Sequence, residues 1–307
     1  MKKICVIGAN GFIGKKLCQR LSRLDISVRA VVKSINLSSE IPNVEYINAG
    51  DINDIKDWSK IFLNCDCVIH CASIGHKIFN QNDEILFNYW NKSVKGISLL
   101  TRQAAENSVK RLIFLSTIKV NGEKNSFSTK MTKSKTCNES RFTHKDIPKP
   151  EDFYGMYKLE MEKKLWEISS STSLEIVIIR PPLVYGKNVK GNLERLIRLI
   201  KINLPLPFGK IQNKRSMIGI DNLVDLLIRC IDHPEASGKT FLVSDGEDLS
   251  TPDLIKLIAS SMGRKANLFP FPLFMLKFLG SIFGKSEEIN RLVGSLRIDN
   301  SYTKEIL

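Results

Sequence analysis

The chain has little histidine and no Cys-X-X-Cys pair, which argues against the commonest metal and redox sites. Only four of its 307 residues are histidine. No pair of histidines has zinc-finger spacing. Most of the seven cysteines fall in apolar segments, which predicts reduced, buried thiols and no metal centre. These cysteines are Cys5, Cys18, Cys65, Cys67, Cys71, Cys137 and Cys230.

Long apolar runs are also missing. No run reaches the roughly 20 residues that span a bilayer, and Met1 leads directly into a strand-like segment without a signal peptide. We therefore expect a cytoplasmic protein with no stable membrane insertion. The most apolar stretch, residues 268–284, is interrupted by Pro270, Pro272 and Lys277. It predicts a core segment or a helix of the substrate-binding region, with contact to a membrane interface as the alternative.

The positive charge is large but is not concentrated in one segment. Forty-six Lys and Arg residues against 32 Asp and Glu give a net charge of +14. The cations are scattered along the chain without a basic, aromatic-rich stripe, so no nucleic-acid partner is expected. A basic surface would attract an anionic cofactor or nucleotide sugar. With 43% hydrophobic residues, the chain can build a sizeable core.

The first fourteen residues contain the strongest local signal. An apolar strand-like segment runs into glycines at a GxxGxxG spacing, at Gly8, Gly11 and Gly14. A diphosphate needs backbone N–H groups close by, and a Cβ at these positions would block its approach. Residues 15–24 read as a helix whose positive N-terminal end faces the loop. The segment therefore predicts a dinucleotide-binding turn.

Apolar strand-like segments alternate with helical patterns through the first 180 residues. This alternation predicts an α/β fold with a doubly wound parallel Rossmann sheet, covered by helices on both faces. The helices expected as crossovers are residues 91–107 and 154–169. The expected strands after the first are residues 27–32, 44–47, 67–71, 111–116 and 174–180.

The alternation of strand-like and helical segments ends at Pro181-Pro182, after which helical segments are separated by proline-rich turns. We expect residues 1–180 to form the dinucleotide-binding domain, with residues 213–232 returning to it. Residues 181–307 are expected to form mostly a smaller substrate-binding region. The lysine- and serine-rich residues 123–135 predict a mobile loop.

A tyrosine and a lysine four residues apart form the second chemical signal. Tyr154 and Lys158 open a helical pattern and lie on the same helix face. An adjacent ammonium, together with a positively charged nicotinamide, would favour the phenolate form of the tyrosine. Such a phenol can take or give a proton at a carbinol or carbonyl oxygen.

Hydroxyl groups end the strand expected at residues 111–116. Ser116 and Thr117 would lie at the carboxyl edge of the sheet, where ligands of open parallel sheets bind. Either hydroxyl could donate a hydrogen bond to the substrate oxygen on which Tyr154 acts.

Together these residues resemble the extended short-chain dehydrogenase/reductase family, which includes nucleotide-sugar epimerases, dehydratases and reductases. Motifs over nearly the whole chain support the resemblance. Besides the glycine loop and the Tyr154–Lys158 pair, they are Gly50-Asp51-Ile52, residues 66–73, Asn91 with residues 94–96, residues 110–114 and residues 180–186.

The resemblance implies specific roles. It places the catalytic set at Thr117, Tyr154 and Lys158, with Thr117 found by counting five residues back from Gly122. It implies that Asn192 and Arg215 contact the nucleoside diphosphate of a UDP-sugar. The residues implied in cofactor binding are Gly8, Gly11, Phe12, Ile13, Gly14, Asp51, Ile52, Cys71, Ala72, Ser73, Tyr154, Lys158 and Pro181.

The cofactor preference depends on the end of the second strand. NAD-specific members of the family usually have an acid there, whereas this chain has Lys33, with Arg29 and Ser34 close by. A cation favours the 2′-phosphate of NADP. We therefore expect NADP, with NAD as the alternative.

The NADP preference and the second half of the chain favour a reductase. The main hypothesis is reduction of the C4 keto group of a UDP-4-keto-6-deoxy-N-acetylhexosamine for surface polysaccharide synthesis. The alternative is a UDP-hexose 4-epimerase acting on UDP-glucose or UDP-N-acetylglucosamine with bound NAD. A non-catalytic dinucleotide-sensing protein is the alternative from another class. The family also suggests a homodimer through the helices at residues 91–107 and 154–169.

Overall fold

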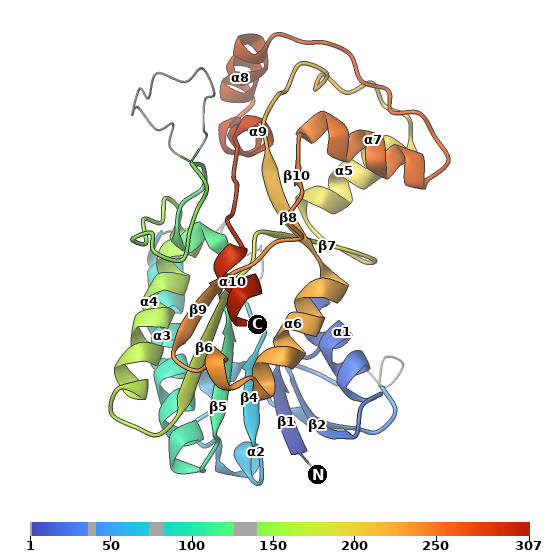
Figure 1. The fold of residues 1–307 in the computed structure, drawn as a ribbon. Coiled ribbons are helices and arrows are strands. Elements are labelled where there is room, and N and C mark those ends of the chain that lie inside the picture. Colours follow the sequence, from blue (N-terminus) through green and yellow to red (C-terminus); the bar gives the residue numbers. More distant parts are fainter. Residues whose placement is uncertain (1, 36–40, 74–82, 126–139) are drawn as a thin grey trace.

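The computed structural model describes residues 2–35, 41–73, 83–125 and 140–307 (Figure 1). Cys137 and most of the loop predicted at residues 123–135 lie outside these ranges. The other six cysteines are free thiols, five of them buried.

A seven-stranded parallel sheet forms the centre of the molecule, in the order β3-β2-β1-β4-β5-β6-β9. This topology confirms the predicted doubly wound α/β fold. The strand order reverses between β1 and β4, which is where ligands bind in such sheets. The strands are β1 (Lys2–Ile7), β2 (Ile26–Val32), β3 (Val44–Asn48), β4 (Cys67–His70), β5 (Arg111–Leu115), β6 (Glu175–Arg180) and β9 (Lys239–Leu242).

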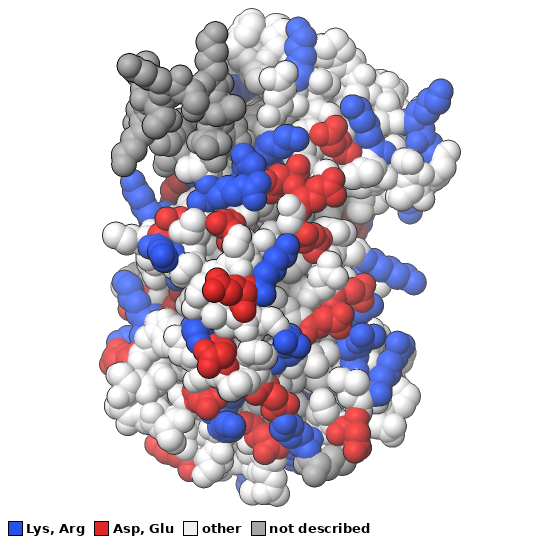
Figure 2. Space-filling model, in the orientation of Figure 1, with Lys and Arg blue, Asp and Glu red and all other residues white. Residues whose placement is uncertain are grey.

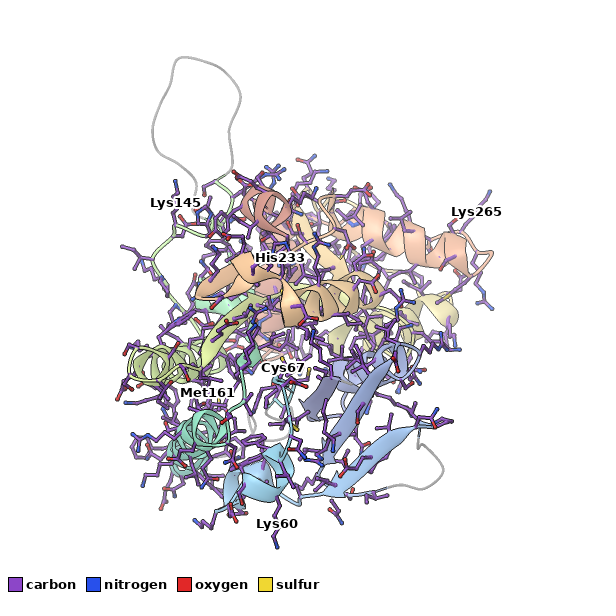
Figure 3. The ribbon with its side chains drawn as sticks, turned by 60° about the horizontal axis from the view of Figure 1, so that its bottom comes forward. Lys60, Cys67, Lys145, Met161, His233 and Lys265 are labelled. Carbon is purple, nitrogen blue, oxygen red and sulfur yellow. The ribbon has the colours of Figure 1, made fainter. Side chains whose placement is uncertain are left out.

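Helices cover both faces of the sheet, as Figure 3 shows from below. Ile4 and Val6 of β1 pack on one face against α1 (Phe12–Leu21) and α6 (Ile220–Asp232). Cys5 and Ile7 pack on the other face, in a hydrophobic cluster with residues of three helices. These are the short α2 (Ser59–Phe62) and the long crossover helices α3 (Asp83–Glu106) and α4 (Phe153–Ser169). Burial on both faces explains why the strands are almost continuously apolar.

Helix α3 begins at Asp83, eight residues before the start predicted at residue 91. Trp90 lies edge-on to Phe153 and Tyr157 of α4, with ring centroids 5.1 and 6.2 Å away. This aromatic packing stabilises the N-terminal part of α3, which the spacing of apolar residues alone did not predict to be helical. The first crossover helix, α1, also begins earlier than predicted, at Phe12, directly after the glycine loop.

The second region lies above the carboxyl edge of the large sheet (Figure 1). It contains a three-stranded sheet in the order β10-β8-β7. Its strands are β7 (Leu183–Tyr185), β8 (Arg215–Gly219) and β10 (Asp248–Leu249). Its helices are α5 (Asn192–Lys201), α7 (Thr251–Ser261), α8 (Leu273–Ile282) and α9 (Ser286–Val293). Short 3-10 turns also occur at η2 (Ile52–Asp54), η4 (Ile118–Val120) and η5 (Pro234–Ala236).

Later parts of the chain return to the large sheet. Helix α6 packs beside α1 in the main core, whereas β8 stays in the small sheet. β9 adds a seventh strand, and Thr303 of α10 (Ser301–Ile306) donates a hydrogen bond to the Leu242 carbonyl at 2.7 Å. The predicted division at residue 180 stays a prediction.

The charges visible in Figure 2 are mixed, with acidic side chains between basic ones across the drawn face. Within the described residues, no helix combines the length and the apolar character that crossing a bilayer requires.

Candidate active site

The glycine loop connects β1 to α1, and its glycines are required for a reason that differs in part from the prediction. Gly8 has a φ of +81°, and a Cβ there would lie 2.7 Å from Cα of Ala72. A Cβ on Gly14 would collide with the carbonyl oxygen of Gly8. At these two positions the protein's own backbone already excludes a side chain. The tight packing in turn keeps the loop N–H groups free of covering side chains.

The start of α1 is suited to an anion. Gly11 precedes the helix and supplies no side-chain cap, and the first turn contains no acidic residue. The first N–H groups of a helix lack partners within it and carry partial positive charge. Asn10 fixes the loop to the end of β2 by donating a hydrogen bond to the Ser34 carbonyl at 2.8 Å. The cradle therefore fits the diphosphate of a dinucleotide.

Lys33 and Arg29, the two cations of this segment, lie in different environments: Lys33 is exposed and Arg29 is buried. Lys33 is exposed directly after β2, beside this loop. Arg29 is 6% exposed, and its guanidinium pairs with Glu45 at 3.0 Å and donates to the Ile61 carbonyl at 2.7 Å. The suggestion that Arg29 helps to bind a 2′-phosphate is therefore wrong. One guanidinium can donate hydrogen bonds to a carboxylate and to backbone carbonyls at the same time. The Arg29 guanidinium thereby links β2 to β3 and α2.

Two further groups of predicted cofactor-binding residues follow β3 and β4. Asp51 caps η2 by accepting a hydrogen bond from the Asn53 N–H at 3.0 Å, and it is half-buried with Ile52. Burial raises the pKa of Cys71 to about 12, so this thiol stays protonated. Ala72 lies against the loop at Gly8, which places the end of β4 beside the cradle.

Helix α4 begins against η4 and so brings Tyr154 to the carboxyl edge of the sheet. The Asp152 carboxylate caps the helix by accepting from the Gly155 N–H at 2.7 Å. A Cβ on Gly155 would lie 2.6 Å from the Lys119 carbonyl oxygen. Only glycine allows this close contact, which places the first turn of α4 next to Thr117 at the start of η4.

The Tyr154 hydroxyl lies 2.9 Å from the Ser73 hydroxyl. This contact joins the ends of β4 and α4. Burial raises the pKa of Tyr154, and the hydrogen bond with Ser73 offsets only part of that effect. In the protein without ligands the phenol is therefore held protonated, and Lys158 does not produce the expected shift toward phenolate.

Lys158 is 1% exposed, one turn further along α4. Its ammonium donates to the Leu115 carbonyl at 2.9 Å and lies 4.4 Å from the centre of the Phe114 ring. Burial lowers the pKa of Lys158 to about 8, although the charge of Glu162 acts in the opposite direction. The ammonium is thus held at the end of β5, where the resemblance expects it to act.

The lowered pKa of Lys158 makes a stability prediction. The unfolded chain keeps this proton up to about 10.5, whereas the folded chain loses it near pH 8. Between these values the unfolded state binds more protons, so Lys158 makes the free energy of unfolding rise with pH. We expect Lys158→Met to remove this rise. Urea unfolding of both proteins at several pH values from 7.5 to about 10.5 measures it. A constant difference between them across that window would contradict the prediction.

The structure distinguishes the two candidate hydroxyls. Ser116 donates a hydrogen bond to the Glu162 carboxylate. Thr117 accepts only a longer bond from the Lys119 N–H, at 3.3 Å. The Ser116 hydroxyl is engaged by this carboxylate, which leaves Thr117 as the better candidate for a substrate-binding hydroxyl.

A buried polar network supports the catalytic helix, and the sequence analysis did not anticipate it. Arg180 donates to both carboxylate oxygens of Glu162, at 3.1 and 2.5 Å, and to the Asn121 side-chain oxygen at 2.9 Å. Glu162 also accepts the Ser116 bond, so it links α4 to the ends of β5 and β6. The one feature of the sequence that could have indicated Glu162 is its position, one helical turn after Lys158.

His70 is a second residue whose place beside Lys158 the sequence did not predict. It ends β4, packs 5.4 Å from the Phe114 ring and has no partner for Nδ1 among the described residues. Burial lowers the pKa of His70 to about 3, and the Lys158 charge acts in the same direction. His70 is therefore neutral and adds no second cation beside Lys158.

The predicted substrate residues belong to the second region, whereas Thr117 follows β5 of the large sheet and Tyr154 and Lys158 lie on α4. Asn192 is exposed at the first position of α5. Arg215, on β8, donates to the carbonyls of Arg291 and Gly294 at 2.7 and 3.1 Å. Pro181 is buried, and its carbonyl accepts from the Ile118 N–H at 2.9 Å. The substrate roles of Asn192 and Arg215 stay predictions.

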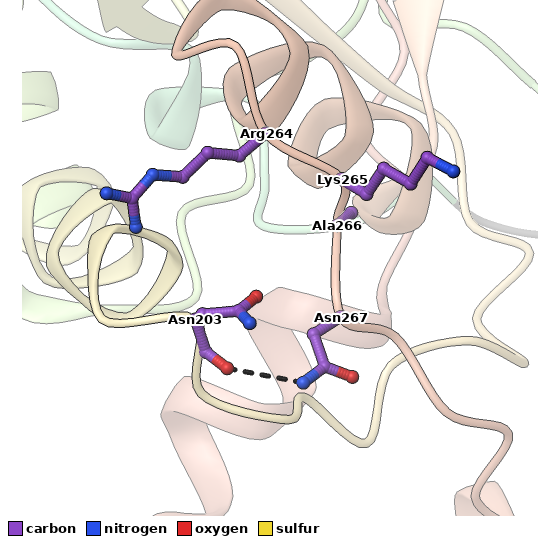
Figure 4. A pocket seen from close by; sticks show the side chains of 5 residues that line it. All are labelled: Asn203, Arg264, Lys265, Ala266 and Asn267. Carbon is purple, nitrogen blue, oxygen red and sulfur yellow. Dashed lines mark hydrogen bonds between the residues drawn. The ribbon is translucent and has the colours of Figure 1, made fainter.

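A surface cavity lies elsewhere, between the end of α5 and the segment after α7 (Figure 4). The Asn267 side chain spans it and donates to the Asn203 carbonyl at 3.2 Å. None of the residues lining the cavity is one of the predicted site residues. They are Asn203, Arg264, Lys265, Ala266 and Asn267.

A Rossmann sheet with a glycine cradle, and a Thr117–Tyr154–Lys158 set at its carboxyl edge, define a dinucleotide-dependent enzyme of the short-chain dehydrogenase type. The profile of the NAD dependent epimerase/dehydratase family matches residues 4–244, and the chain belongs to this family.

Individual relatives are similar over nearly the whole chain. The UDP-glucose 4-epimerase of Vibrio cholerae is 40% identical over 309 residues, covering 100% of this chain and 90% of that protein. The N-acetyl-alpha-D-glucosaminyl-diphospho-ditrans,octacis-undecaprenol 4-epimerase of Escherichia coli O157:H7 is 24% identical over 298 residues, covering 94% and 82%.

Solved structures share the fold. The UDP-glucuronic acid 4-epimerase of Bacillus cereus in complex with NAD superposes with a TM-score of 0.77 at 22% identity, covering 99% of this chain and 92% of that one. These findings confirm the predicted family and the prediction of an enzyme. The expected NADP preference and the reductase reaction gain no support from them, whereas the epimerase alternative fits better.

Proposed function

We propose that the protein is a UDP-hexose 4-epimerase that uses NAD. The observation that carries this proposal is the placement of Tyr154 at the carboxyl edge of the sheet, 2.9 Å from Ser73 and one turn before buried Lys158. The 40% identical relative named a UDP-glucose 4-epimerase supports the epimerase over the reductase.

The described residues fit a dinucleotide. The diphosphate would lie on the N–H groups of the first turn of α1, because those of Gly8, Ala9 and Gly11 already donate to backbone carbonyls. Asp51 would face the adenosine half. Lys158, at the end of β5, would hold the nicotinamide ribose. When bound, NAD supplies a reversible hydride acceptor for C4 of the sugar.

Tyr154 provides the proton transfer that accompanies oxidation and reduction at C4. The phenolate takes the proton of the C4 hydroxyl as the carbonyl forms, and returns it when the alcohol is re-formed with the opposite configuration. The sugar regains every atom that it lost, so the reaction consumes no reductant. The positive charge of the nicotinamide ring, when NAD is bound, would favour the phenolate that burial alone disfavours, and the Thr117 hydroxyl orients the C4 oxygen.

One experiment separates the epimerase from the reductase. The purified protein is mixed with UDP-glucose without added cofactor, and UDP-galactose is followed by chromatography. Its appearance, with NAD released on denaturation, supports the proposal. No interconversion, but oxidation of added NADPH at 340 nm with a UDP-4-keto-6-deoxy-N-acetylhexosamine, would overturn it and establish the reductase.

Lys33 provides the test of cofactor preference. Its side chain is exposed, and a solvated charge contributes at most about 1 kcal/mol, or about fivefold in affinity. We expect Lys33→Ala to change the Kd for NAD⁺ by less than this factor, measured by calorimetry on cofactor-stripped protein. Exposed Lys60→Ala, on α2, is the control. Tighter binding of NADP⁺ than of NAD⁺, lost on Lys33→Ala, would instead support the original expectation.

A further inference from the structure

Helix α8 exposes an unusual amount of apolar surface. Phe274, Phe278 and Ile282 are 74%, 65% and 61% exposed, and Phe283 after the helix is 72% exposed. Scattered exposed apolar residues are normal, but large contiguous groups mark a binding surface. We call this group the α8 face; its members are Leu273, Phe274, Met275, Phe278, Leu279, Ile282 and Phe283.

Only a narrow strip attaches α8 to the protein. Leu276 and Gly280, one turn apart, are its buried residues. Gly280 lies so close to α9 that a Cβ there would collide with Ile289. The helix is therefore held from one side, and the apolar side chains around the rest of it are exposed. Figure 1 shows α8 at the end of the molecule opposite the N-terminus.

Helix α8 contains one basic residue, Lys277, and no acidic one. Lys277 is exposed and forms no ion pair with a described residue. Lys285 follows the helix, and Glu287 and Glu288 lie in the first turn of α9, where Glu288 pairs with Lys285 at 3.3 Å. Lys277 is thus the charge that the α8 face itself carries.

We propose that the α8 face binds reversibly to the surface of an anionic lipid bilayer. Large apolar side chains enter the interface between headgroups and acyl chains, and lysines beside them attract anionic headgroups. A helix of ten residues is about 15 Å long, so α8 lies on a bilayer and does not span it. A second copy of the chain is the poorer occupant, because a symmetric contact would bring equal positive charges together.

Vesicle sedimentation tests this surface directly. The full chain is mixed with vesicles of phosphatidylcholine alone, or of phosphatidylcholine with phosphatidylglycerol. We expect binding to the anionic vesicles, weakened by salt, and at least about tenfold weaker binding for Phe274→Ser/Phe278→Ser. Lys277→Glu is expected to reduce the preference for anionic lipid.

Leu257→Ser is the matched control, because Leu257 is 54% exposed on α7, outside the α8 face. Its binding to vesicles should equal that of the unchanged protein. Circular dichroism and thermal unfolding verify that each variant folds, whatever its sugar substrate proves to be. Absence of sedimentation with anionic vesicles would overturn the proposal. So would a dimer seen by light scattering that the double Phe→Ser variant converts to monomer, since a second copy would then cover the face.

Discussion

Replacing Tyr154 with phenylalanine is expected to lower kcat for UDP-hexose interconversion by about 10²–10⁴-fold, the usual contribution of a positioned acid–base group. The substitution removes the hydroxyl 2.9 Å from Ser73 and keeps the ring that packs at the start of α4. Binding of NAD and UDP-sugar should therefore change little. Steady-state kinetics and calorimetry on the same preparation measure both quantities.

Tyr157→Phe is the matched control on the same helix. Tyr157 is buried against Trp90 and Phe153, where its ring fills space between α3 and α4. This variant should keep most of the activity. If Tyr154→Phe were as active as Tyr157→Phe, Tyr154 would not be the acid–base group. A protein that binds NAD and converts no nucleotide sugar would instead favour the dinucleotide-sensing alternative.

The second large effect is expected on stability, at Glu162. Its carboxylate is 2% exposed and accepts bonds from Arg180 and Ser116. Removing one partner of a buried ion pair leaves the other charge without compensation, which costs about 3–5 kcal/mol. We expect Glu162→Ala to lower the free energy of unfolding by this amount in urea titrations of cofactor-stripped protein.

Glu160→Ala, two residues earlier on α4, controls for the loss of a helical glutamate. Glu160 pairs at 3.3 Å with Lys163, whose side chain is 62% exposed, so the pair is worth about 0–1 kcal/mol. Glu162→Gln should fall between the two alanine variants, because it keeps hydrogen-bonding atoms but loses the charge. Equal losses for Glu162→Ala and Glu160→Ala would show that the Arg180 network contributes little.

These experiments act on different links of the proposal. Tyr154→Phe tests the chemistry, and Glu162→Ala tests how firmly the catalytic helix is joined to β5 and β6. The variants of the α8 face test whether the enzyme binds to a membrane surface, and they leave α4 unchanged. A loss of vesicle binding with unchanged kcat would show that docking and catalysis are separate properties.

The sequence by itself determined the features that depend on neighbours along the chain. Buried parallel strands need continuous apolar residues, so β1, β2 and β5 were recognisable from composition alone. The tight turn after β1 needs glycine at Gly8. The four-residue spacing of Tyr154 and Lys158 already placed both on one helix face.

Only the tertiary structure decided features that depend on residues distant in sequence. Glu162 engages Ser116, 46 residues away, which favours Thr117 as the substrate hydroxyl. Arg29 looked available for a phosphate until Glu45 and the carbonyls of α2 were brought to it. Burial, which is a property of the folded environment, sets the protonation of Tyr154 and Lys158. The apolar residues of α8 read as core in the sequence, and they are exposed because nothing in the described chain packs over them except the narrow contact with α9.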